Sequence, residues 1–103
     1  MGRELLFLID GFGFDTFATY ADAMPTMSRM FNHGLIQTAF PSTTATSLAT
    51  LTTGAMPGTH GMLGYTVQVP RSGGRLLNAL KWDERVDPAN WQPVETLFQR
   101  ATA

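Results

Sequence analysis

Apolar and polar positions divide the chain into short segments with strand-like and helix-like patterns. The run LLFLI at Leu5–Ile9 is continuously apolar, has the length of a strand and is followed by the turn-forming residues DGFG. Such a run is typical of a strand buried on both faces, as in a parallel sheet. A second apolar segment, LIQTAF at Leu35–Phe40, predicts the next strand. With a helical segment between them, the two strands predict a right-handed βαβ unit.

The segment between the two predicted strands, DTFATYADAMPTMSRMFNHG, has a helical but interrupted pattern. Pro25 is suited to the first turn of a second helix, because a proline there removes no helical hydrogen bond. Met27, Met30 and Phe31 follow helical spacing and form an apolar stripe. Gly34 predicts the end of this helix, since glycine is the preferred residue just after a helix C-terminus.

Further elements are predicted after the second strand. The hydroxyl-rich segment TTATSLATLTTG predicts a helix that ends near Gly54, and the segments YTVQVP and RLLNAL predict a hairpin around the turn RSGG. The last segment, PANWQPVETLFQRATA, predicts a helix with Pro93 near its first turn. Three apolar residues lie on one face of this predicted helix: Val94, Leu97 and Phe98.

This order of elements predicts an α/β fold with a mixed or parallel sheet flanked by helices. In such chains a helix leads into another strand, whereas the last predicted helix here runs to Ala103. Two strands, a crossover, a hairpin and a terminal helix also leave a thin sheet with little to cover it. We therefore predict that residues 1–103 are the N-terminal portion of one larger domain, whose remainder lies C-terminal to Ala103.

Composition narrows the class of protein. The chain has 103 residues, 44% of them hydrophobic, with 15% charged residues and a formal net charge of -1. This balance predicts neither a nucleic-acid groove nor a surface for anionic membranes. The chain has no cysteine, which excludes disulfides and thiolate metal sites. The N-terminal apolar run is too short for a signal peptide or a transmembrane helix, so we expect a cytoplasmic protein.

Asp10 is the first candidate for a chemical role. It directly follows the predicted strand Leu5–Ile9 and precedes Gly11 and Gly13. Ligands of open α/β sheets bind at the carboxyl ends of the strands, and a carboxylate beside glycines that permit close backbone approach suits a metal ion. The alternative is structural, with Asp10 forming a turn or capping a helix that starts near Phe14. The segment GFGFD lacks the third glycine of a dinucleotide-binding motif.

The second candidate is the hydroxyl-rich segment FPSTTATSLATLTTG, which holds six Thr and two Ser in fifteen positions. Its first hydroxyls fall at a predicted helix N-terminus, where unpaired N–H groups and a positive partial charge favour a phosphate or sulfate. A hydroxyl bound there to a metal can lose its proton and attack phosphorus. The alternative is N-capping by Ser42 or Thr43, which accounts for one or two hydroxyls. Others can fill a tight helix–sheet interface.

Three segments together carry a family resemblance: LLFLIDGFG, MPTMSRMFNHG and FPSTTATSLATLTTGAMPGTHGMLGY. They resemble the start of the alkaline phosphatase superfamily, and more narrowly its type I phosphodiesterase / nucleotide pyrophosphatase branch. The branch's Thr-Gly-x-x-Pro-x-x-His-Gly signature falls, without insertion, on Thr53, Gly54, Pro57, His60 and Gly61. The match extends over residues 5–65, and the combination of motifs is more specific than any one of them.

The resemblance implies which hydroxyl reacts. The family's nucleophile lies ten residues before the Gly of Thr-Gly and three after the preceding Pro, and counting from Gly54 and from Pro41 gives Thr44 both times. The resemblance further implies a phosphate-ester substrate, two divalent metal ions, most often zinc, and a phosphothreonine intermediate. Asp10 and Thr44 would bind one of these ions. The family's remaining Asp and His ligands lie far along its chains, so we expect residues 1–103 alone to be inactive.

The remaining titratable residues do not match the family's metal ligands. His60 belongs to the signature, where we expect a structural role, and His33 is placed to stabilise a helix C-terminus. The same mismatch applies to the other aspartates, Asp15, Asp22, Asp83 and Asp87.

The resemblance also leaves alternatives open. The branch continues after its nucleophile with Phe-Pro-Asn, whereas Ala45, Thr46 and Ser47 follow Thr44 here. A sulfatase would need Cys or Ser at the position of Thr44. A phosphomutase of the same superfamily remains an alternative, because it too can use Thr. A truncated or interaction module that keeps the fold without the chemistry is the non-catalytic alternative.

Overall fold

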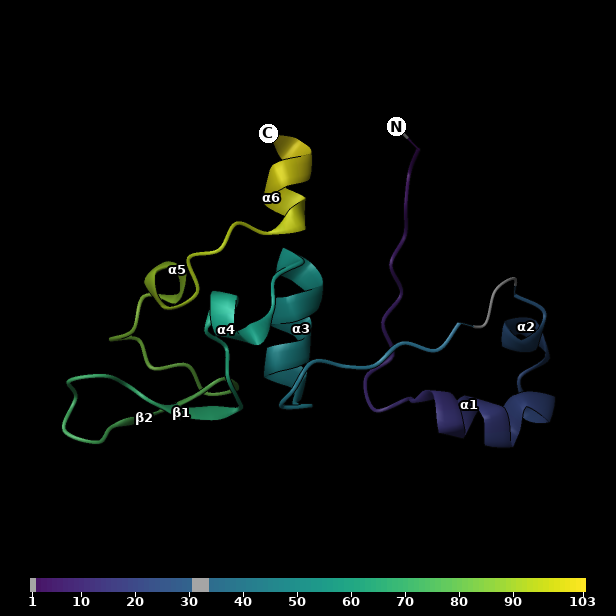
Figure 1. Cartoon of the computed structure of the whole chain (residues 1–103), viewed down its shortest axis with the longest axis horizontal. Coiled ribbons are helices and arrows are strands. Elements are labelled where there is room, and N and C mark those ends of the chain that lie inside the picture. Colours follow the sequence, from purple (N-terminus) through teal and green to yellow (C-terminus); the bar gives the residue numbers. More distant parts are fainter. Residues whose placement is uncertain (1, 31–33) are drawn as a thin grey trace. The chain divides into compact units, whose positions relative to one another are not determined.

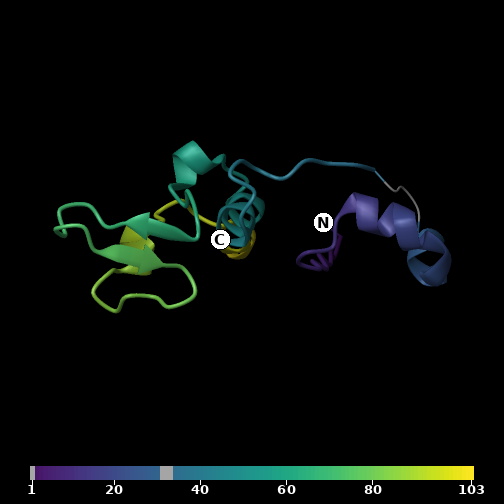
Figure 2. The ribbon, with the colours of Figure 1, turned by 90° about the horizontal axis from the view of Figure 1, so that it is seen from below.

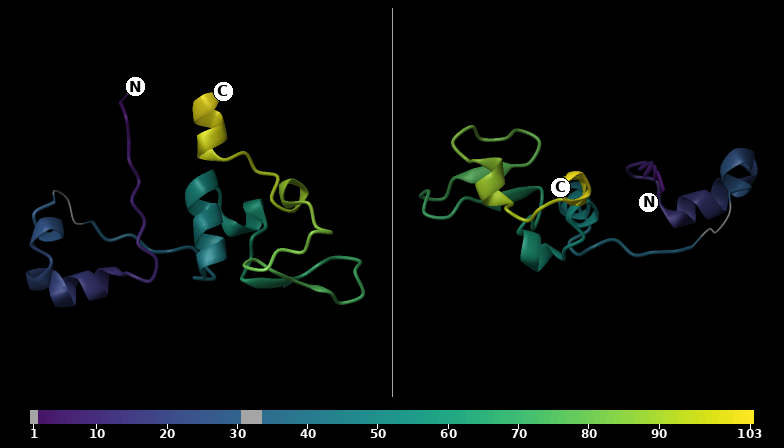
Figure 3. Two further views of the ribbon diagram at one scale, coloured as in Figure 1. Left: turned by 180° about the vertical axis from the view of Figure 1, so that it is seen from behind. Right: turned by 90° about the horizontal axis from the view of Figure 1, so that it is seen from above.

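The computed structural model describes residues 2–30 and 34–103 (Figure 1). The chain divides into two compact units, Met1–Gln37 and Thr38–Ala103. Figures 2 and 3 show the elements of the second unit from three further directions: from below, from behind and from above.

The first unit contains short helical elements that follow one another closely. They are α1 (Phe14–Tyr20), the 3-10 turn η1 (Ala21–Ala23) and α2 (Pro25–Ser28). The Ser28 hydroxyl donates a 2.8 Å hydrogen bond to the carbonyl of Ala21 and so ties α2 back to η1. The predicted interruption of the helix is thus confirmed.

The second of these helices begins as predicted and ends earlier than predicted. Pro25 is the first residue of α2, where its missing N–H leaves no helical bond unmade. The helix ends at Ser28, short of the expected stop at Gly34. Two residues of the predicted apolar stripe and helix end, Phe31 and His33, lie outside the described residues.

The structure does not show the two predicted parallel strands, and their arrangement stays a prediction. Leu5–Ile9 and Leu35–Phe40 have no strand pairing among the described residues, and the sheet in the described part of the chain is an antiparallel pair farther along. The apolar side chains of both segments are exposed, with Leu5 at 94% and Phe40 at 89%. A strand exists only when a neighbour accepts its backbone hydrogen bonds, and hydrophobicity alone does not supply that neighbour.

The second unit begins with two helices that pack against each other. They are α3 (Thr44–Thr53) and the short α4 (Pro57–His60), which lie side by side in Figures 1 and 3. The predicted end of α3 is confirmed, because Gly54 has the left-handed conformation, φ 69°, that closes many helices. The same device closes α4, where Gly61 has φ 77°.

A hairpin follows, as predicted. Strands β1 (Thr66–Gln68) and β2 (Leu76–Asn78) pair antiparallel, with Val67 opposite Leu77 (Figure 2). Leu77 is 1% exposed and is the buried hydrophobic residue of the described chain. The Ser72 hydroxyl donates to the Val69 carbonyl at 2.6 Å and accepts from the Arg75 N–H at 3.0 Å, which holds the turn together.

An ion-pair cluster supports the hairpin from the segment after β2. Asp83 lies 2.9 Å from the guanidinium nitrogens of both Arg75 and Arg85. The side-chain hydrogen bonds from Arg85 are the main reason why the pKa of Asp83 falls to about 2. Nearby, the indole N–H of Trp82 donates a 2.7 Å bond to the carbonyl of Val86.

The structure also corrects the prediction of a single last helix. Two helices form instead, α5 (Pro88–Trp91) and α6 (Leu97–Thr102), and Pro93 and Val94 lie between them. The break has a local cause, because Thr96 starts a new helix with a capping box. Its hydroxyl accepts from the N–H of Gln99, and the Gln99 side chain accepts from the N–H of Thr96.

Candidate functional site

Thr44 is the first residue of α3 and is exposed. The preceding residue, Thr43, is the N-cap in extended conformation, with φ −105° and ψ 154°. The Thr43 hydroxyl accepts a 3.3 Å bond from the N–H of Thr46 and donates a 3.0 Å bond to the Thr46 hydroxyl. Of the two residues considered for the cap, Thr43 therefore fills the role and Ser42 does not.

Other hydroxyls of α3 form a stripe along one face of the helix. Thr46, Thr50 and Thr53 are spaced four and three residues apart, as one helix face requires, and Thr46 and Thr53 are 0% and 2% exposed. The Thr53 hydroxyl donates a 2.6 Å bond to the carbonyl of Ala49 and accepts from the N–H of Ala55. We call these three residues the threonine stripe. The described packing partner of α3 here is the helix α4, whereas the sequence predicted an interface with a sheet.

His60 joins the threonine stripe to α4. Its Nε2 lies 2.8 Å from the hydroxyl oxygen of Thr50, and its Nδ1 accepts a 3.0 Å bond from the N–H of Met62. A nitrogen that accepts carries no proton, so Nε2 carries it and donates to Thr50. His60 is 1% exposed, and burial lowers its pKa below the ordinary value of 6.5. These contacts support the structural role that was predicted for this residue.

The C-terminal end of α3 is held by the last helix. Nη2 of Arg100 donates a 2.7 Å bond to the carbonyl of Thr53, where the helix leaves its last carbonyls without intrahelical partners. A Cβ at Gly54 would lie 3.7 Å from the Arg100 guanidinium and 3.8 Å from a methyl group of Leu97. No local sequence pattern predicts this contact, because 47 residues separate the donor from the acceptor.

Asp10 lies in the first unit, in a turn, and is exposed. It precedes Gly11, whose φ of 71° requires the left-handed conformation that glycine adopts readily. The structural alternative in which Asp10 caps the helix near Phe14 is wrong, because Gly13 is the N-cap of α1 and no side chain caps it. Asp10 and Thr44 belong to different units, so their predicted proximity stays a prediction.

The donor set for a metal ion is small in the described part of the chain. Residues 2–30 and 34–103 contain no group of three or more His, Asp or Glu that could hold an ion. Asp10 and Thr44 offer oxygen atoms, which suit a divalent cation, but two protein ligands are fewer than a zinc site uses. The residues present therefore fit part of one site.

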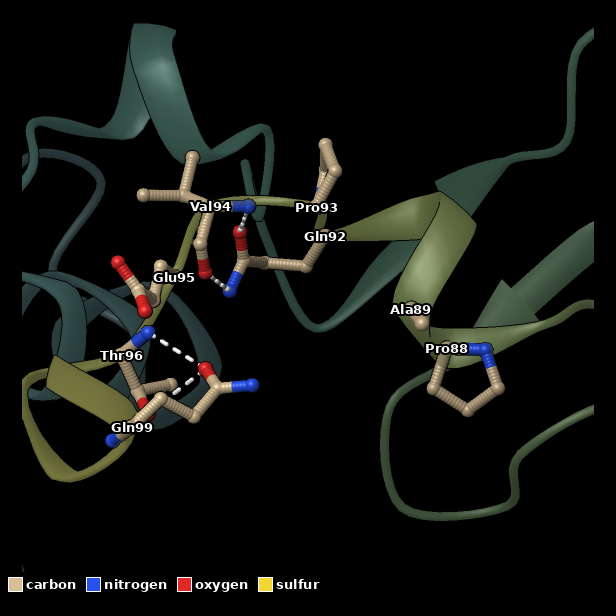
Figure 4. Close-up of a pocket in the computed structure, with 8 residues that line it drawn as sticks. All are labelled: Pro88, Ala89, Gln92, Pro93, Val94, Glu95, Thr96 and Gln99. Atoms are coloured by element: carbon tan, nitrogen blue, oxygen red, sulfur yellow. Dashed lines mark hydrogen bonds between the residues drawn. The ribbon is translucent and has the colours of Figure 1, made fainter. Parts of the chain in front are cut away.

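A shallow cavity of about 600 Å³ lies beside α5 and the start of α6 (Figure 4). Three of its polar side chains, those of Gln92, Thr96 and Gln99, are occupied by local bonds. The Gln92 amide bonds both the N–H and the carbonyl of Val94, at 2.7 and 3.1 Å, and the Gln99 side chain bonds Thr96. Neither Asp10 nor Thr44 lines this cavity.

The described helices are all too short or too polar to span a membrane. Comparison with curated proteins and with solved structures gives no match. The protein family described as type I phosphodiesterase / nucleotide pyrophosphatase matches residues 5–103, which is nearly the whole chain. The chain therefore belongs to the type I phosphodiesterase / nucleotide pyrophosphatase family.

Proposed function

We propose that this chain is the N-terminal portion of a metal-dependent phosphoric ester hydrolase in which Thr44 is the nucleophile. The family supports phosphodiesterase or nucleotide pyrophosphatase chemistry in general. The observation that supports the residue assignment is the place of Thr44, exposed and first in a ten-residue helix. A nucleophile must be reachable by the substrate, and a helix N-terminus favours the negative charge of a phosphoryl group.

The other threonines of this segment have structural roles. The Thr43 hydroxyl caps the helix and donates to the Thr46 hydroxyl, while the hydroxyl of Thr50 contacts His60. The hydroxyls of Thr52 and Thr53 donate to carbonyls one helical turn earlier, at 2.8 and 2.6 Å.

The proposed reaction has two displacements at phosphorus. The Thr44 hydroxyl loses its proton, its oxygen forms a bond to phosphorus, and the bond to the leaving oxygen breaks, which gives a phosphothreonine. Water then attacks the same phosphorus, the bond to Thr44 breaks and the phosphate group is released. A divalent ion would supply the charge that lowers the pKa of the attacking hydroxyl.

We propose Asp10 as the carboxylate that holds this ion together with Thr44, with zinc as the metal. A second ion and the missing ligands would come from the remainder of the domain. The exposed apolar segments support the existence of that remainder, since Phe7 is 81% and Ile36 88% exposed. Buried in the complete domain, each such side chain would contribute about 1.5–3 kcal/mol.

A non-catalytic interaction module is the second candidate. The observation that favours it is the lack of any group of three ionisable metal ligands within residues 2–30 and 34–103. It predicts that no form of the protein turns over phosphate esters, and that Thr44 tolerates substitution without any functional loss.

A metal titration separates the two candidates. The complete domain, freed of metal, is titrated with zinc while hydrolysis of an aryl phosphodiester is followed. We expect Asp10→Asn to raise the zinc concentration needed for half-maximal activity, and the matched control Asp15→Asn in α1 to leave it unchanged. Equal behaviour of the two variants would remove Asp10 from the site, and an inactive wild-type domain would favour the interaction module.

A further inference from the structure

We propose that His60 is a positioning residue for the nucleophile, because its bond to Thr50 fixes the helix that begins with Thr44. The effect that we expect this contact to have on turnover rests on the proposed function. The structural part of the inference is the hydrogen bond between His60 of α4 and Thr50 of α3, which we call the lock between the two helices. This part can be tested without measuring activity.

The lock is buried and uses both nitrogens of the imidazole. His60 is the last residue of α4 and is 1% exposed, and its ring lies between the hydroxyl of Thr50 and the N–H of Met62. Because Met62 donates to Nδ1, the ring has one tautomer in which Nε2–H donates to Thr50. A neutral ring is thus part of the contact, and burial, which lowers the pKa of His60, acts in the same direction.

The contact is well placed to control Thr44. Thr50 follows Thr44 by six residues, less than two helical turns, in a helix that is rigid along its axis. A second side-chain bond between α3 and another helix, from Arg100 to the Thr53 carbonyl, lies at the far end. At the end of α3 that carries Thr44, the Thr43 hydroxyl bonds the N–H of Thr46 within the same segment.

The surroundings of His60 hold few charges. The sequences of α3 and α4, TATSLATLTT and PGTH, contain no Asp, Glu, Lys or Arg. The charged residue that contacts α3 is Arg100 of α6, which bonds the Thr53 carbonyl. The lock therefore depends on hydrogen bonding between neutral groups.

The first test uses this chain and needs no substrate. The tautomer of His60 is read from the nitrogen chemical shifts of its ring. The stability of the first turn of α3 is measured by hydrogen exchange of the Ser47 amide, which bonds the Thr43 carbonyl. We expect neutral His60 with the proton on Nε2 at neutral pH. Thr50→Val leaves the Met62 bond in place and should keep the tautomer, but it should speed exchange at Ser47 by about twofold to tenfold, the range for one lost hydrogen bond.

Two variants make this test specific. Thr52→Val is the matched control, because the Thr52 hydroxyl bonds the Leu48 carbonyl within the same helix. Thr50→Ser keeps the acceptor and should restore the wild-type exchange rate. A charged His60, a proton on Nδ1, or equal effects of Thr50→Val and Thr52→Val would overturn the inference, and the wild-type tautomer decides it even if a variant fails to fold.

The second test measures turnover in the complete domain and separates this inference from the proposed function. We expect Thr50→Val to lower kcat by about twofold to tenfold with KM unchanged, and Thr50→Ser to restore it. If Thr44→Ala abolishes activity while Thr50→Val has wild-type kcat, the positioning role is overturned and the nucleophile stands. If Thr44→Ala is fully active, the proposed function fails, while the lock is still decided by the tautomer.

Discussion

The apolar segment Leu5–Ile9 is exposed and the hydroxyl-rich helix α3 is partly buried, which is the opposite of what their compositions suggest. The five apolar side chains of the first are 41–94% exposed, whereas Thr46 and Thr53 of the second are 0% and 2% exposed. The difference lies in where each finds its partners. The hydroxyls of Thr46, Thr50 and Thr53 bond groups at most ten residues away, whereas a strand needs a neighbour that the local sequence does not contain.

The comparison also separates two kinds of hydroxyl within α3. The buried hydroxyls of Thr46 and Thr53 bond groups within their own segment, and the Thr50 hydroxyl bonds His60 of α4. Thr44, exposed at the start of the helix, is the residue that we propose as the nucleophile. We therefore expect both the exposed apolar side chains of Leu5–Ile9 and the exposed residue Thr44 to contact groups outside residues 1–103. The predictions below test the comparison from its strongest consequence to its weakest.

Thr44→Ala in the complete domain should lower turnover by at least about a thousandfold, because the nucleophile is lost and no neighbouring hydroxyl is placed to replace it. The fold should survive, since alanine is the better helix former and Thr44 is exposed. Turnover and thermal unfolding are measured on the same preparation. Wild-type activity in Thr44→Ala would end the assignment of this residue.

Phe7→Ala tests whether the exposed apolar segment Leu5–Ile9 is buried in the complete domain. In the complete domain, where we propose that this segment is a buried strand, the substitution should lower the free energy of unfolding by about 3–5 kcal/mol. In residues 1–103 alone it should change little, because Phe7 is 81% exposed. Chemical denaturation of both forms measures the difference. Equal small effects in both would mean that the segment is exposed in the domain too.

Local signals in the sequence predicted much of this structure. The helix ending at Gly54, the helix beginning at Pro25 and the hairpin around the Gly-rich turn all depend on residues whose backbone preferences act within a few positions. The single last helix was wrong for a related reason. Apolar spacing across Val94, Leu97 and Phe98 suggested continuity, but the capping box at Thr96 starts a new helix.

Contacts between distant residues were out of reach of the sequence. The bonds from His60 to Thr50 and from Arg100 to Thr53 join residues 10 and 47 positions apart, with no motif that specifies them. The parallel strands stay a prediction for the same reason, since continuous hydrophobicity predicts burial without identifying a partner. For the site, the family resemblance implies Thr44 and Asp10, and both the assignments and the proximity of the two residues stay predictions.

Thr43→Ala should cost stability while sparing most of the chemistry. The variant loses the N-cap bond to the Thr46 N–H, and such losses cost about 0.5–2 kcal/mol. Turnover in the complete domain should fall far less than in Thr44→Ala, because the cap does not attack phosphorus. Thermal unfolding and turnover of the two variants are compared side by side. If Thr43→Ala were inactive and Thr44→Ala active, the roles of cap and nucleophile would be reversed.

The weakest effect is the pH dependence of the buried lock. Burial lowers the pKa of folded His60 below its ordinary value of 6.5, so below that pH the unfolded chain binds more protons than the folded chain. The contribution of His60 to stability is therefore complete above about pH 6.5 and is lost as the pH falls toward the folded pKa. Its slope is at most about 1.4 kcal/mol per pH unit for one proton.

Asp83 titrates in a separate range and provides the internal comparison. Hydrogen bonds from Arg85 lower its pKa from 3.8 to about 2, so its contribution is present above about pH 4 and is lost only between there and about pH 2. Denaturant unfolding of residues 1–103 from pH 8 to pH 3 should thus show a first decline below pH 6.5. In Asp83→Asn that decline should persist. It should persist in Thr50→Val as well, because burial is the cause of the lowered pKa of His60 and valine leaves the ring as buried as threonine does. A first decline that begins only below pH 4 would mean that His60 is not buried as the neutral ring that holds α3 to α4.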